Sequence, residues 1–117
     1  MAFLIRGRIA PAGKHEAELT GCEEHQGQYG KTALRWTFVV RGGESDGQEL
    51  TKVTGDQARL GTSLGDFLAQ LYGRDLRSGE AVDPVRDLVG RRFQVFAVPG
   101  PNGDGAVIQT VKPVTPA

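Results

Sequence analysis

The chain has 117 residues, 38% hydrophobic and 24% charged, which is the composition of one ordinary globular domain and excludes a disordered segment. Fourteen basic and fourteen acidic side chains give zero formal net charge, so the strongly basic class of nucleic-acid-binding proteins is excluded as well. The single cysteine, Cys22, excludes an internal disulfide bond. Because no apolar run resembles a signal peptide or a membrane span, we expect a cytoplasmic protein without a membrane partner.

Glycine and proline divide the chain into short segments, with 17 Gly and 6 Pro in all, a pattern typical of all-β proteins. The first segment, residues 14–24, alternates: His15, Ala17 and Leu19 fall on one face and charged residues on the other. This period of two predicts the first strand. Gly21 predicts a bulge or bend within it.

Residues 32–41 are the clearest predicted strand, because apolar residues occupy every second position: Leu34, Trp36, Phe38 and Val40. This parity assigns Trp36 to the core and not to a ligand-binding surface. Residues 42–47 predict a turn. Residues 48–54 predict a third strand, which we expect to form a hairpin with the second.

The period then changes to that of a helix in residues 62–74, where one apolar stripe is formed by Leu64, Phe67, Leu68, Leu71 and Tyr72. Ser63 is the predicted N-cap and Gly73 the predicted left-handed C-cap. A short second helix is predicted for residues 83–90, with Asp83 as its cap and a proline in its first turn.

Two further strands are predicted, at residues 91–98 and 106–112, and we expect the tail, residues 113–117, to be flexible. The order is therefore three strands, a helix, a short helix and two strands. It predicts an all-β fold with one capping helix, namely a five-stranded antiparallel OB-fold barrel. We expect one domain over residues 1–117, with its core in about 14–112 and the helix closing one end of the barrel.

Four stretches of the chain resemble a family of small OB-fold proteins from phages and bacteria. They are residues 27–40 (GQYGKTALRWTFVV), 47–50 (GQEL), 64–73 (LGDFLAQLYG) and 83–92 (DPVRDLVGRR). The resemblance covers roughly residues 14–112. It implies a barrel that binds single-stranded nucleic acid, similar to modules of replication protein A and of bacterial single-strand-binding proteins.

OB barrels bind ligands on the outer face of their second and third strands. The parity of the second strand places its cations outward, and Lys52 points outward beside them if Val53 points inward. Cations that contact phosphates, with a ring that stacks on bases, are what single-strand binding requires. With one ring available, we expect weak binding of single-stranded DNA, or secondarily RNA, without strong sequence preference. The predicted binding residues are Tyr29, Lys31, Arg35, Thr37, Arg41 and Lys52.

Two other interpretations of this outer face stay open. Outward Arg and Lys side chains are often paired with acidic residues across a strand, and Glu44 and Glu49 are near enough in sequence to do so. Zero net charge and few exposed rings favour instead a module for protein interaction or assembly. In that case a homo-oligomer could form through the second strand or through residues 1–9.

No constellation of residues predicts catalysis, a metal site or a cofactor. His15, Cys22 and His25 match no zinc-ligand spacing. Cys22 and His25 are three residues apart and would face opposite sides of a strand, which argues against a nucleophile and its base. We therefore expect a non-enzymatic protein with no cofactor and no metal.

Overall fold

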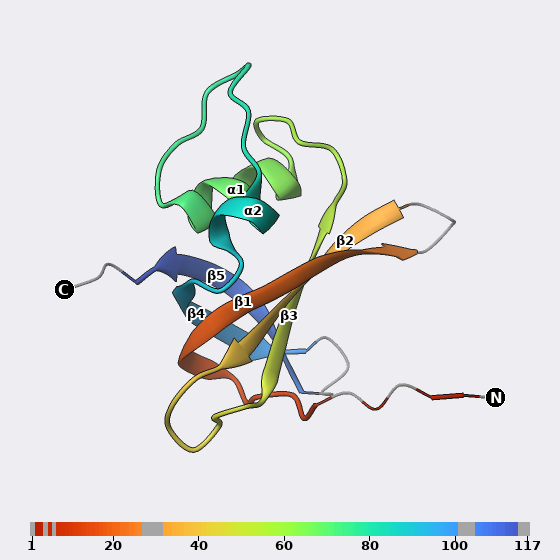
Figure 1. Cartoon of the computed structure of the whole chain (residues 1–117), viewed down its shortest axis with the longest axis vertical. Coiled ribbons are helices and arrows are strands. Elements are labelled where there is room, and N and C mark those ends of the chain that lie inside the picture. Colours follow the sequence, from red (N-terminus) through yellow and green to blue (C-terminus); the bar gives the residue numbers. More distant parts are fainter. Residues whose placement is uncertain (1, 4, 6, 27–31, 101–104, 115–117) are drawn as a thin grey trace.

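The computed structural model describes residues 2–3, 5, 7–26, 32–100 and 105–114. These residues contain five strands and two helices in the predicted order (Figure 1). The elements are β1 (Gly13–Gln26), β2 (Thr32–Val40), β3 (Glu49–Gly55), α1 (Ser63–Tyr72), α2 (Pro84–Leu88), β4 (Arg92–Pro99) and β5 (Ala106–Pro113).

The strands form one antiparallel sheet in the order β3-β2-β1-β4-β5. The predicted hairpin of the second and third strands is confirmed, with Phe38 opposite Leu50. The 14-residue strand β1 pairs with β4 through its first half and with β2 through its second half. Its register with β2 shifts between Leu19 and Gly21, which confirms the predicted bulge.

The two edge strands, β3 and β5, contact each other, and α1 packs against both of them (Figure 1). Side chains of α1 connect the helix to both edges. Ser63 Oγ accepts a hydrogen bond from Gly55 N of β3 at 3.0 Å, and Gln70 Oε1 accepts one from Val111 N of β5 at 2.9 Å. The helix therefore satisfies backbone donors at edges that lack a neighbouring strand at these points.

Aromatic rings from the strands and α1 meet in the core. Phe67 of α1 lies 5.4 Å from Trp36 and 6.4 Å from Phe38, and Phe38 lies 5.8 Å from Phe93, measured between ring centroids. Trp36 is 2% exposed, which confirms its predicted place in the core. Its indole N–H donates to Thr54 Oγ1 at 3.1 Å, so the polar group of this buried ring is satisfied.

The ends of α1 differ from the prediction at one residue. Thr62 is the N-cap, because its Oγ1 accepts a hydrogen bond from Gly65 N at 3.1 Å. The prediction of Ser63 in this role was wrong, since Ser63 bonds to β3 instead. Gly73 ends the helix with φ of 70°, as predicted.

Helix α2 packs beside the end of α1. Asp83 caps it by accepting from Arg86 N at 3.1 Å, which confirms the predicted cap, and it ends at Leu88 instead of Gly90. Tyr72 of α1 is partly buried, and its hydroxyl donates to Asp87 Oδ2 at 2.9 Å. Burial, and then this hydrogen bond, raise the pKa of Tyr72 to about 12.

The predicted tail begins later than expected, because β5 includes Pro113, and Val114 N donates to Arg92 O at 3.2 Å. Residues 115–117, also predicted to be flexible, lie outside the described residues. Within the described part of the chain, no helix is long and apolar enough to cross a membrane.

Candidate nucleic-acid interface

The outer face of β1 and β2 carries three of the six predicted binding residues. Trp36, Phe38 and Val40 alternate along β2 and are buried, so Arg35 and Thr37 lie on the opposite side of the strand. Arg41 directly follows β2 and continues the same face. The prediction that Arg35, Thr37 and Arg41 share an outer face is therefore confirmed.

Lys52 lies on the other side of the sheet. Its Cα partner across the strands is Trp36, and its alternate neighbours on β3, Leu50 and Thr54, are buried. Val53 is 51% exposed and pairs with Arg35. The predicted placement of Lys52 beside the arginines is wrong, because Thr54 faces inward to bind the indole of Trp36.

The two remaining predicted residues, Tyr29 and Lys31, lie outside the described residues.

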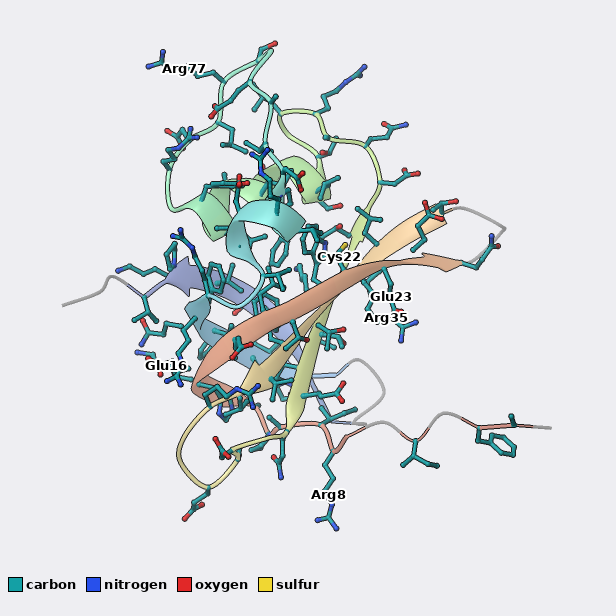
Figure 2. The ribbon with its side chains drawn as sticks, in the orientation of Figure 1. Arg8, Glu16, Cys22, Glu23, Arg35 and Arg77 are labelled. Atoms are coloured by element: carbon teal, nitrogen blue, oxygen red, sulfur yellow. The ribbon has the colours of Figure 1, made fainter. Side chains whose placement is uncertain are left out.

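Each arginine of this face lies beside a glutamate of β1. Arg35 Nε is 3.8 Å from Glu23 Oε1, and Arg41 Nε is 3.3 Å from Glu18 Oε1. Figure 2 shows Glu23 and Arg35 side by side on the outer side of the sheet. Both of these partners come from β1, whereas the sequence suggested Glu44 and Glu49 of the hairpin as candidates. Because partly exposed ion pairs contribute about 0–1 kcal/mol, a phosphate can compete for these arginines.

A hollow of about 370 Å³ lies on this face, next to the bulge of β1. At the bulge, Thr20 Oγ1 donates to Thr37 O at 3.1 Å. The half-buried Cys22 also borders the hollow, and burial together with the Glu23 carboxylate raises the pKa of its thiol. Cys22 is therefore protonated at neutral pH and poorly suited to act as a nucleophile. The hollow is lined by Ile5, Thr20, Gly21, Cys22, Glu23, Thr37 and Glu49.

A second surface, on the outer face of β1, β4 and β5, was missed in the sequence analysis. Phe96 is 39% exposed there and lies across from Lys14 of β1. A signal was present in the sequence: Phe93 and Phe96 are three residues apart in a strand, so they cannot share a face. Phe93 is buried, which leaves Phe96 outside.

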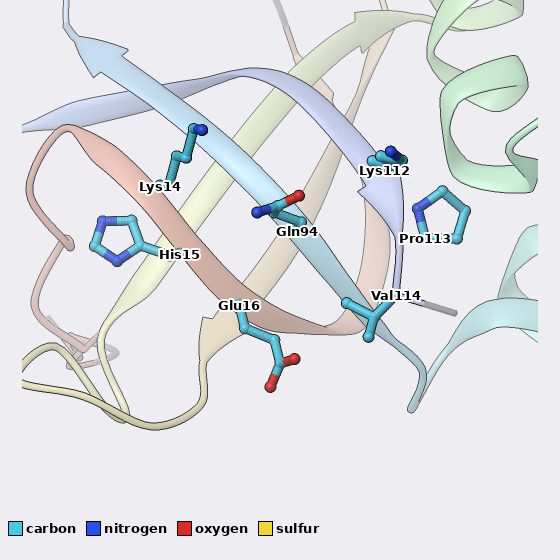
Figure 3. A pocket seen from close by; sticks show the side chains of 7 residues that line it. All are labelled: Lys14, His15, Glu16, Gln94, Lys112, Pro113 and Val114. Atoms are coloured by element: carbon cyan, nitrogen blue, oxygen red, sulfur yellow. The ribbon is translucent and has the colours of Figure 1, made fainter. Parts of the chain in front are cut away.

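This second surface also contains a hollow, of about 460 Å³. Figure 3 shows Gln94 near its centre, with Lys14 on one side and Lys112 on the other. The hollow is lined by Lys14, His15, Glu16, Gln94, Lys112, Pro113 and Val114.

Among the described residues, no three His, Cys, Asp or Glu side chains are arranged to hold a metal ion. Neither the protein-family models nor the curated proteins match this chain.

Proposed function

We propose that this chain is an OB-type barrel without catalysis of its own that binds single-stranded nucleic acid, with DNA as the first ligand to test. The observation that carries the proposal is the order of the sheet. The long β1 pairs with both β2 and β4, and the edge strands β3 and β5 contact each other and α1. Five strands in this arrangement are typical of the partly open Greek-key barrel of OB proteins.

The face of β1 and β2 offers this ligand two arginines, Thr37 and a hollow beside them. The arginine fork can bind phosphate through two hydrogen bonds and can stack on a base. Glu18 and Glu23 compete with phosphate for the same side chains. Binding through this face is therefore weak at physiological salt.

The competition between Glu23 and phosphate for Arg35 can be tested by removing the charge of the glutamate. We expect Glu23→Gln to increase affinity for a labelled oligothymidine by roughly fivefold in a fluorescence-anisotropy titration at low salt, because one exposed ion pair accounts for about 1 kcal/mol.

Glu24→Gln is the matched control for this measurement. It makes the same change in charge one residue along β1, where pairing with Leu34 places the side chain on the opposite face. Equal affinities of the Glu23→Gln and Glu24→Gln variants would show that Arg35 does not contact the oligonucleotide. A wild-type chain that does not bind at tens of micromolar would refute the function itself.

A second candidate function, assembly with another copy of the chain, is favoured by the N-terminal segment. Three of its large apolar side chains are exposed: Phe3 by 77%, Ile5 by 87% and Ile9 by 56%. The segment is attached to β3, where Glu49 N donates to Arg8 O at 2.7 Å, and its described residues extend away from the sheet (Figure 1). Extended apolar segments of this kind are typical of arms that add to a partner.

The assembly function predicts a dimer of the wild-type chain in multi-angle light scattering. It predicts a monomer for the Phe3→Ser, Ile5→Ser double variant, because the exposed arm then has little apolar area left to bury against the second copy. A monomeric wild-type chain at high protein concentration would contradict it.

A further inference from the structure

Three neighbouring strands place an aromatic ring between cations on the outer face of β1, β4 and β5. Phe96 of β4 lies directly across from Lys14 of β1 and Thr110 of β5. Two residues before Phe96, on the same face of β4, Gln94 lies across from Lys112 of β5. Phe96 is the one exposed aromatic ring on the described strands. The ring of Phe96 is thus one strand away from each cation, directly across from Lys14 and diagonal to Lys112.

The electrostatics of this face differ from those of the β1–β2 face. Within the described part of the chain, neither Lys14 nor Lys112 has a carboxylate at ion-pair distance. The nearby Glu16 carboxylate is bound by Arg92, with Nη1 and Oε2 2.9 Å apart. A phosphate can therefore bind the two lysines without first breaking an ion pair of the protein.

The hollow between the lysines has a volume of about 460 Å³, which is within the range of small-ligand sites, and it contains a polar group that can contact a base. Neighbouring strands are about 4.8 Å apart, so β1 and β5 are separated by about 10 Å across β4. The amide of Gln94, near the centre of the hollow in Figure 3, can both donate and accept hydrogen bonds. An amide of this kind can contact the edge of any base, which fits binding without sequence preference.

From these observations we infer a nucleotide-binding subsite on the outer face of β1, β4 and β5. A base stacks on Phe96, the flanking phosphates bind Lys14 and Lys112, and Gln94 contacts the base edge. The inference rests on the proposed function, since its ligand is the same single strand. It places the strongest contact on β1, β4 and β5, away from the arginines of β2.

Two sets of variants test the subsite by anisotropy titration with the labelled oligothymidine. Lys14→Gln, Lys112→Gln should make the slope of log K against log salt shallower by about 1.4, because each lost contact with a single strand removes about 0.7. Phe96→Leu should weaken binding roughly 5- to 150-fold through lost stacking, while Phe96→Tyr keeps the ring and the affinity.

Arg59→Gln, Arg77→Gln is the matched control for the lysine pair. It removes the same charge from exposed residues beyond the sheet, near the helical end of the molecule, where Figure 2 labels Arg77. The thermal unfolding of every variant is measured first. Ultraviolet cross-linking of the wild-type chain to a bromodeoxyuridine oligonucleotide adds a readout that needs no variant, and we expect the adduct on β4.

The outcomes separate this inference from the function on which it rests. Binding by the wild-type chain, with equal losses for the lysine pair and the control pair, would overturn the subsite and leave the function intact. A cross-link on β2 in place of β4 would do the same. A wild-type chain that does not bind oligothymidine would overturn both.

Discussion

At the scale of single residues, Gly65 is the glycine, among those that the structure describes, whose added Cβ would meet the nearest atom. It lies in α1, where alanine would raise helix propensity by about 1 kcal/mol. A Cβ at this position would lie 2.2 Å from the carbonyl oxygen of Arg59. The same oxygen accepts a hydrogen bond from Thr62 Oγ1 at 2.7 Å, so it holds the N-cap of the helix.

We predict that Gly65→Ala lowers the free energy of unfolding by about 1–3 kcal/mol, because overpacking exceeds the gain in propensity. Urea unfolding followed by the fluorescence of Trp36, the one tryptophan of the chain, measures this change.

The control for this prediction is Gly21→Ala, which adds the same atom at a position with nothing within 4 Å of the new Cβ. We expect its stability to stay close to that of the wild-type chain. A Gly65→Ala variant as stable as the control would contradict the close approach of Arg59 to α1.

At the scale of elements, the order of strands and helices could be predicted because most segments carry a dense pattern. Alternate residues of β2 are apolar from Leu34 to Val40, and the apolar stripe of α1 recurs at helical spacing. The pattern of β3 is sparse, and its apolar Val53 misled the assignment of faces. A tertiary requirement, a hydrogen-bond partner for the buried indole of Trp36, selects Thr54 for the inner face.

Neighbouring elements also decide details that local sequence leaves undetermined. Thr62 and Ser63 can both cap a helix, and the free backbone donor of Gly55 on β3 engages Ser63. The glutamates beside Arg35 and Arg41 could not be identified from the sequence. Their positions depend on the register of β1 against β2, which the bulge after Leu19 shifts. Phe96 was predictable in principle, because two aromatic residues three apart in a strand face opposite sides.

At the scale of the whole molecule, zero net charge conceals an uneven distribution of charge. On the outer face of β1 and β2, Arg35 and Arg41 each pair with a glutamate of β1. On the face of β1, β4 and β5, Glu16 pairs with Arg92, and Lys14 and Lys112 add positive charge. Affinity for a polyanion depends more on the local arrangement of charges than on the net charge of the chain. Weak, salt-sensitive binding of single strands is therefore compatible with a chain of no net charge.

The most direct test of the central claim, that this chain binds single-stranded nucleic acid, is the salt dependence of oligothymidine binding by the wild-type chain. Contacts with two or three phosphates predict saturable binding at low salt. They also predict a slope of log K against log salt of about −1.4 to −2.1, because each contact contributes about −0.7. Absence of binding at low salt, or an affinity unaffected by salt, would contradict the claim.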